Sequence, residues 1–131
     1  MKLLLEEPGS TEAEATWDAA DRRLSTRLLY VEARAALGTA IRDRRVRPRD
    51  ARPLHDRLDD YWTAVDPIEV DEQVVARAGD LADEHALRGY DAVHLASAEA
   101  VSDDDTWFVA ADTRLVAAAQ GHGLATLLLA E

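Results

Sequence analysis

Two continuous apolar runs near the end of the chain, 106–111 and 124–129, constrain its fold more than any other feature. Neither run alternates polar with apolar residues, and this pattern is typical of strands that are buried on both faces of a parallel sheet. A helical segment, 112–120, separates them, so the order is strand–helix–strand with short connections. The sequence therefore predicts an α/β protein, in which helices cover a parallel central sheet to form a three-layer α/β/α sandwich.

Helical spacing of apolar residues, with cap-like residues or a proline in front, predicts further helices in the rest of the chain. Ser25 or Thr26 is expected to cap the second helix, Pro48 to lie in the first turn of the third, and Asp71 to cap the fourth. A short strand is expected at 67–70. The expected helices are 10–20, 27–44, a helix from 48 onward, 71 to about 88, 91–101 and 112–120.

The composition limits both the class of protein and the kind of site. With 131 residues, the chain has room for one domain, 1–131, whose core needs no disulfide or metal to hold it. The absence of cysteine excludes disulfides, thiolate metal sites and cysteine nucleophiles, and it agrees with a reducing cytoplasm. No apolar stretch approaches the roughly 20 residues that span a bilayer, so we expect no membrane span.

The net charge of −11 argues against broad electrostatic capture of nucleic acid, although acids gathered around a metal ion add negative charge by design. One basic stretch is the exception. It consists of Arg42, Arg44, Arg45, Arg47, Arg49 and Arg52. A solvated helix end explains this stretch without any ligand. The alternative is contact with RNA or a partner protein through Arg44, Arg45 and Arg47.

Two aspartates stand at the expected starts of consecutive helices, Asp91 and Asp112. Each is a good helix N-cap, and a cap is the ordinary role of a single aspartate in that place. Asp91, however, shares one helix face with Leu95 and Ala98, which directs it toward the interior. Asp112 follows the carboxyl end of a strand, where open α/β sheets place their ligands. The two carboxylates can therefore converge on one cleft.

Glu32 is the third candidate acid. Its helical sector includes Leu28, Leu29, Ala35 and Ala36, and an ionised glutamate on an apolar face is costly unless it is paired or binds a cation. A salt bridge to a neighbouring arginine is the alternative. Ligands that offer only oxygen, without clustered histidine or cysteine, favour Mg²⁺ or Mn²⁺ over zinc. Such an ion can activate a water for attack on a phosphodiester.

The histidines are expected to have structural roles. His94 lies on the same helix as Asp91, where a hydrogen-bonded core histidine is favoured over a catalytic base. His55, His85 and His122 are expected to be surface or loop residues. The two glycines that flank His122 predict the end of a helix.

Four segments of the chain together resemble PIN-domain ribonucleases, specifically the VapC-type toxins of bacterial toxin–antitoxin pairs. The most specific is Tyr90–Ala98, which is similar to the family's aspartate-alanine-x-histidine-leucine-alanine motif. Lys2–Ser10 resembles the stretch after the family's first strand, and Ser25–Leu37 resembles the helix that bears its glutamate. Val109–Leu115 resembles the strand and aspartate before its last helix. The resemblance spans essentially the whole chain in the expected order.

The resemblance implies a PIN-like fold and a Mg²⁺- or Mn²⁺-dependent endoribonuclease, which a cognate antitoxin holds in check. By position, Asp91 is then a direct metal ligand, and Glu32 and Asp112 are ligands or hold water. Thr113 is a weaker candidate beside them. The expected partners are RNA, the antitoxin and a second copy in a homodimer, in the cytoplasm.

The sequence departs from the family pattern at its beginning. The family's first strand ends in an aspartate a few residues ahead of the position that Lys2 matches, and the sequence has no such position. We therefore expect the first strand to be missing, and we hypothesise a normal start upstream in frame, which the upstream nucleotides would test. One alternative is a non-catalytic truncated PIN domain that binds the antitoxin or a partner subunit. The other is an unrelated α/β module whose acids are caps and salt bridges.

Overall fold

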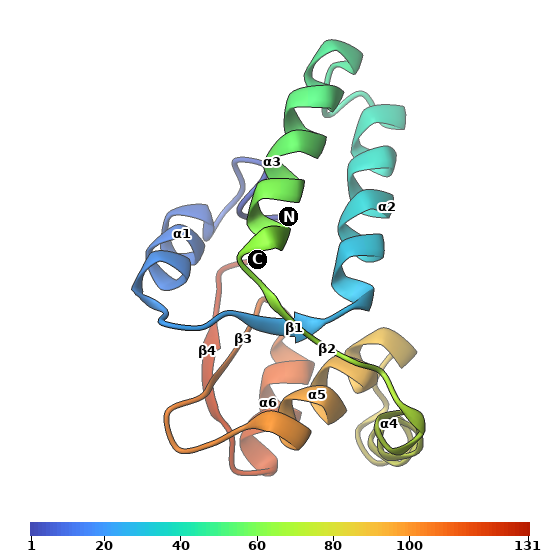
Figure 1. The fold of residues 1–131 in the computed structure, drawn as a ribbon. Coiled ribbons are helices and arrows are strands. Elements are labelled where there is room, and N and C mark those ends of the chain that lie inside the picture. Colours follow the sequence, from blue (N-terminus) through green and yellow to red (C-terminus); the bar gives the residue numbers. More distant parts are fainter. The chain divides into compact units, whose positions relative to one another are not determined.

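The computed structural model describes all residues from 1 to 131 and contains two compact units (Figure 1). The N-terminal unit is Met1–Pro67 and the C-terminal unit is Ile68–Glu131. Both helices and strands are present, with one parallel pair of strands, so the expected α/β class is confirmed. No helix is both long enough and apolar enough to cross a membrane.

Helices dominate the N-terminal unit. Its elements are α1 (Ser10–Ala19), β1 (Leu24–Thr26), α2 (Leu28–Arg42), the 3-10 turn η1 (Pro48–Asp50), α3 (Ala51–Thr63) and all but the last residue of β2 (Asp66–Ile68). α2 and α3 lie side by side (Figure 1), and Leu37, Leu58 and Leu4 form the buried core of this unit. Pro48 begins the turn that leads into α3, because its fixed φ suits a first turn and its missing N–H is not needed there.

β1 and β2 form a two-stranded sheet, and the N–H of Asp66 donates to the carbonyl of Arg23 at 2.8 Å. One expectation is wrong here, and another is confirmed. Ser25 and Thr26 lie in β1 and do not cap α2, whose N-terminus has no side-chain cap. The short strand expected at 67–70 is confirmed as β2, which begins one residue earlier and pairs with β1. Ser25 and Thr26 are extended because pairing between β1 and β2 gives the backbone N–H and C=O groups of this segment hydrogen-bond partners.

The C-terminal unit combines helices with a parallel pair of strands. Its elements are α4 (Glu72–His85), α5 (Gly89–Val101), β3 (Trp107–Ala110), α6 (Thr113–Gly121) and β4 (Ala125–Leu128). β3 and β4 are parallel, with Trp107 opposite Ala125, and α6 connects them. Asp71 caps α4 as expected, because its side chain accepts a hydrogen bond of 2.9 Å from the N–H of Val74. Leu81, Leu95 and Ala119 are fully buried in the core of this unit.

β3 and β4 are less buried than their apolar sequences predict. Trp107 is 63% exposed, Val109 38% and Leu128 45%. The other residues of β3, Phe108 and Ala110, pack against the core, because successive side chains of a strand point to opposite faces. The expectation that these strands are buried on both faces is therefore wrong.

Candidate functional site

Asp112 lies at the junction between β3 and α6, just beyond the carboxyl end of the strand. Its backbone is extended, and its Oδ1 accepts a hydrogen bond of 2.9 Å from the N–H of Leu115. The expected helix cap is therefore confirmed. The cap uses one carboxylate oxygen, and the other, Oδ2, faces Arg88.

Asp91 lies in the first turn of α5, and its side chain is 20% exposed. The expectation that Asp91 opens this helix is wrong, because Gly89 and Tyr90 are already helical and Arg88 is the N-cap residue. The carboxylate of Asp91 instead accepts a hydrogen bond of 3.0 Å from Nε of Arg88. The next residue on the helix, Ala92, is fully buried, so Asp91 is held at the edge of the core.

Arg88 brings the two aspartates to one place. Its Nε donates to Oδ2 of Asp91 at 3.0 Å, and its Nη2 lies 3.8 Å from Oδ2 of Asp112. The hydrogen bond with Asp91 is the largest cause that raises the pKa of Arg88 above its ordinary value, and the charges of both aspartates add to it. The guanidinium side chain is 81% exposed, so water screens both ion pairs and they contribute little to stability.

The donor set around Arg88 suits a hard divalent cation. Asp91 and Asp112 offer carboxylate oxygens, which Mg²⁺ and Mn²⁺ prefer as protein ligands. Oδ2 of Asp91 and Oδ2 of Asp112 are already paired with one positive group, the guanidinium of Arg88. A metal ion on the same side of the carboxylates would compete with the guanidinium for them.

Glu32 lies on α2 and belongs to the N-terminal unit, whereas the two aspartates belong to the C-terminal unit. It is half-buried and takes part in interactions of its own. The sector assigned to it from the sequence is not the packed face of α2, because Leu29 is 37% exposed. Tyr30, Ala33 and Leu37 form that packed face instead. The expectation of an inward apolar sector around Glu32 is therefore wrong, and its role as a ligand stays a prediction.

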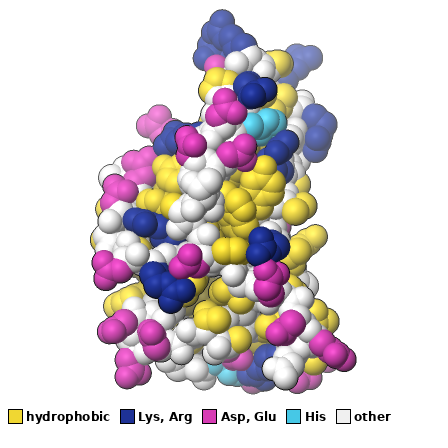
Figure 2. Space-filling model, in the orientation of Figure 1, with side chains coloured by type: hydrophobic (Ala, Val, Ile, Leu, Met, Phe, Trp, Pro, Cys, Tyr) yellow, Lys and Arg dark blue, Asp and Glu magenta, His cyan; other side chains and the backbone are white.

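The remaining expected contacts are on the surface. Arg44, Arg45 and Arg47 are exposed where α2 turns toward η1, and Figure 2 shows Lys and Arg side chains gathered over this end of the N-terminal unit. Arg47 is paired with Asp50 at 2.7 Å. Thr113 is the first residue of α6, directly after Asp112, and it is exposed.

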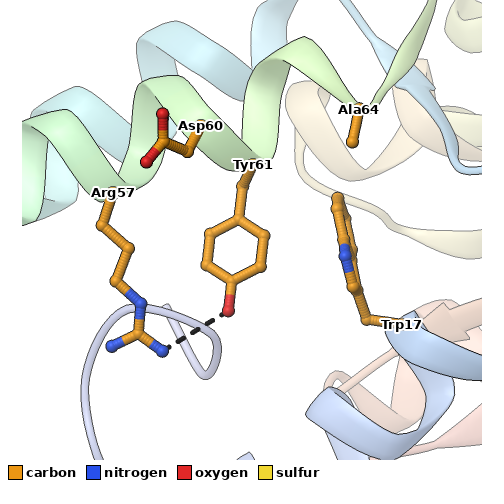
Figure 3. Close-up of a pocket in the computed structure, with 5 residues that line it drawn as sticks. All are labelled: Trp17, Arg57, Asp60, Tyr61 and Ala64. Carbon is orange, nitrogen blue, oxygen red and sulfur yellow. Dashed lines mark hydrogen bonds between the residues drawn. The ribbon is translucent and has the colours of Figure 1, made fainter.

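An aromatic pocket of about 310 Å³ lies in the N-terminal unit (Figure 3). Its lining residues are Trp17, Arg57, Asp60, Tyr61 and Ala64. The rings of Trp17 and Tyr61 meet edge to face with centroids 5.0 Å apart, and Nη2 of Arg57 donates to the Tyr61 hydroxyl at 3.4 Å. None of the expected acids lines this pocket, so it does not support the acidic site.

Two histidines that were expected to be surface or loop residues are in fact half-buried and in contact. The side chains of His85 and His122 are 24% and 20% exposed, and their Nε2 atoms are 2.7 Å apart. The expectation of no clustered histidine is therefore wrong. The sequence gives no local signal for this pair, since the two residues are 37 positions apart.

The parallel β3–α6–β4 unit, with an acid at the end of β3 and another at the start of α5, is consistent with one known family. The profile of the PIN domain matches residues 1–121, and the chain belongs to the PIN domain family. The PIN-like fold expected from the resemblance is thereby confirmed.

Curated relatives give a finer comparison. The chain is 44% identical over 123 residues to Ribonuclease VapC45 of Mycobacterium tuberculosis (strain CDC 1551 / Oshkosh). It is also 44% identical over 123 residues to Ribonuclease VapC49 of Mycobacterium tuberculosis (strain ATCC 25618 / H37Rv). Each alignment covers 94% of this chain and 85% of the relative. The resemblance to VapC-type proteins is therefore confirmed.

Proposed function

We propose that the chain is a metal-dependent endoribonuclease of the VapC type, the toxin of a toxin–antitoxin pair. Its relatives are named as VapC ribonucleases, and PIN nucleases depend on a divalent metal ion. The proposed cofactor is Mg²⁺ or Mn²⁺, since the donors are carboxylate oxygens. The reaction is hydrolysis of an RNA phosphodiester bond by water.

The observation that carries the proposal is the convergence of Asp91 and Asp112 on the guanidinium of Arg88. A single aspartate at a helix start is explained as a cap, and Asp112 does serve as one. Asp91 is not the cap of α5, yet its carboxylate lies at the edge of the core and faces the same cation as Asp112. Capping alone therefore does not explain the pair.

Under this proposal, Asp91 and Asp112 hold the metal ion, with Glu32 as a further acid and Thr113 as an accessory residue. When bound, the ion supplies Lewis acidity that activates water and offsets charge on the scissile phosphate. The protein's own part is to fix the carboxylates in advance. The cap on α6 orients Asp112, and the first turn of α5 positions Asp91 beside the buried Ala92.

The proposed partners are those that a toxin-type ribonuclease requires. RNA is the substrate, and the exposed Arg44, Arg45 and Arg47 are the proposed contacts with its phosphates or with a partner protein. A cognate antitoxin is the regulatory partner, and a second copy of the chain forms a homodimer. The proposed location is the cytoplasm, in agreement with the absence of cysteine.

Cleavage of labelled RNA by the purified chain, with Mg²⁺ or Mn²⁺ and with a chelator, tests the proposal. We expect metal-dependent cleavage that Asp91→Asn lowers by at least about 100-fold, since even outer partners of metal ligands are worth about 10- to 100-fold. Asp104→Asn is the matched control, because it makes the same chemical change at an exposed acid in the turn before β3, and it should leave the rate unchanged.

Circular dichroism should show the same helix content in both variants. Equal cleavage by the chain and by Asp91→Asn would remove Asp91 from the mechanism. If no cleavage occurs with either metal while the chain still binds its antitoxin, the non-catalytic PIN domain is the better description.

A further inference from the structure

A second group of metal-ligand side chains lies at the other end of α6. His122 directly follows this helix as its C-cap residue, and His85 is the last residue of α4. The Nε2 atoms of the two imidazoles are 2.7 Å apart. Oε1 of Glu84 lies 3.5 Å from Nε2 of His85 and 3.9 Å from Nε2 of His122. Three different potential ligand atoms therefore face one another at close range.

We propose that Glu84, His85 and His122 form a Zn²⁺ site that is separate from the acidic site. Zinc binds imidazole nitrogen and carboxylate oxygen at about 2.0–2.2 Å, so ligand atoms at the corners of a tetrahedron are about 3.4 Å apart. The two distances from Glu84, 3.5 and 3.9 Å, are close to this spacing. Only the two imidazole nitrogens must separate further, by less than about 1 Å, which ring rotation provides.

The surroundings of His122 support its role as a ligand. Its other nitrogen, Nδ1, lies 3.4 Å from Oε1 of Glu99 and 3.5 Å from Nη2 of Arg77. Glu99 is held by Nε and Nη2 of Arg77 at 2.8 and 3.1 Å. Without metal, the contact from Nη2 of Arg77, which can only donate, places the lone pair of His122 at Nδ1. With Zn²⁺ at Nε2, Nδ1 would carry the proton and donate it to Glu99, which is the usual arrangement of a carboxylate behind a ligating histidine.

Charge at this place also favours a cation. α4 ends at His85 and α6 ends at Gly121, and the C-terminal end of a helix carries partial negative charge. Glu84 and Glu99 add two carboxylates on either side of the imidazole pair. Arg77 offsets part of this charge, since it is paired with Glu99 and its Nη2 also contacts Nδ1 of His122.

The composition of the cluster distinguishes its metal from that of the acidic site. Imidazole nitrogens suit zinc and its transition-metal neighbours, whereas Mg²⁺ prefers oxygen alone. Two histidines and one glutamate are also a set that leaves a fourth position to water. Glu84 is 55% exposed at its side chain, so solvent reaches that position.

Without metal, the short contact requires one imidazole to donate its Nε2–H to the lone pair of the other. A simple hydrogen-bonded pair of this kind is the competing explanation. It predicts no saturable metal binding, and it gives the exposed carboxylate of Glu84 no particular role.

Calorimetric titration of the chelator-treated chain with Zn²⁺ separates the two explanations. We expect one saturable site per chain, and we expect Zn²⁺ to raise the melting temperature by several degrees, because the ion binds only the folded state. Co²⁺ should give the visible absorption of a tetrahedral nitrogen–oxygen site. Asp91→Asn should bind Zn²⁺ as the parent chain does, so the result does not depend on the proposed nuclease function.

His122→Ala and His85→Ala should weaken Zn²⁺ binding at least about tenfold. Glu84→Gln provides a variant that changes only an exposed side chain, so loss of affinity there cannot come from misfolding. His55→Ala, on α3 in the N-terminal unit, is the matched histidine control and should leave the affinity unchanged. Equal binding by the parent chain and by all three cluster variants, or no saturable binding by the parent chain, would overturn the proposal.

Discussion

The two ends of α6 gather different kinds of donor. At its start, Asp112 lies with Asp91 around the guanidinium of Arg88, and the donors that face one another are oxygens. At its end, His122 lies against His85, and the facing donors are nitrogens. The helix dipole favours a carboxylate at the N-terminus and a bound cation at the C-terminus, so each end suits the group that it carries. One helix of 9 residues can therefore position two sites of opposite chemical preference.

Replacing Asp112 should give the largest effect and should test the acidic end alone. Asp112→Ala removes both the cap and the carboxylate, so we expect RNA cleavage to fall at least about 100-fold and stability to fall by about 1 kcal/mol. Asp112→Asn keeps an oxygen that can cap α6, so stability should recover while cleavage stays lost. Cleavage rates and urea unfolding measure the two effects.

Zinc affinity should be unchanged in both Asp112 variants, because the histidines lie at the other end of α6. Full cleavage by Asp112→Asn would show that this aspartate is only a cap. Weaker zinc binding in Asp112→Asn would show that the two ends of the helix are not independent.

A change at Glu99 should test the histidine end without removing a proposed ligand. Glu99→Gln keeps the size of the side chain but removes the negative charge behind Nδ1 of His122. We expect zinc affinity to fall about tenfold, since the partner of a ligating histidine tunes its basicity. Calorimetry measures the affinity, and the ring-nitrogen NMR signals of His122 should report the altered hydrogen bond.

Glu72→Gln is the matched control for this experiment. It makes the same chemical change in the first turn of α4, at the opposite end of the helix from His85. If Glu72→Gln and Glu99→Gln lower zinc affinity equally, the effect comes from net charge and not from the contact with His122.

The smallest effect is expected at Arg88, where a protein cation and a metal ion compete. Arg88→Ala should raise Mn²⁺ affinity by no more than about fivefold, because exposed ion pairs are weak. Arg88→Lys keeps the charge and should stay near the parent value. Calorimetric Mn²⁺ titration gives the comparison, and weaker binding in Arg88→Ala would mean that the guanidinium supports the site.

This competition should not depend on pH in the ordinary range. The pKa of Arg88 is raised, so its charge is fully present below the ordinary arginine value and would be lost only as the pH rises through the higher, folded-state value. Between about pH 6 and 9 the guanidinium therefore stays charged, and the ratio of the Mn²⁺ affinities of Arg88→Ala and the parent chain should stay constant.

The sequence predicts best those features that depend on neighbouring residues. The cap at Asp112, the cap at Asp71 and the strand–helix–strand order near the end of the chain are confirmed, because short-range hydrogen bonds and apolar runs determine them. Ser25 and Thr26 show the limit of this reasoning. Their local tendency to cap is overruled by pairing between β1 and β2, which are far apart in the sequence.

The two candidate sites also differ in how far the sequence predicts them. The motif around Asp91 could be recognised because it lies in one continuous segment, although the helix begins earlier than expected, at Gly89. The contact between His85 and His122 joins two helix ends, and neither end carries a local pattern that indicates the other. Such a cluster becomes visible only when the packing of α4, α5 and α6 is known.

The separation of 37 positions between His85 and His122 also affects the conformational freedom of the chain between them. A metal ion that joins these residues closes a loop of that length. Closing a long loop removes more conformational entropy from the unfolded chain than closing a short one. α4 and α6 are the first and last helices of the C-terminal unit, and α4 packs mainly against α5. A shared ion would therefore tie the fraying of one helix end to that of the other, so that both open as one cooperative segment.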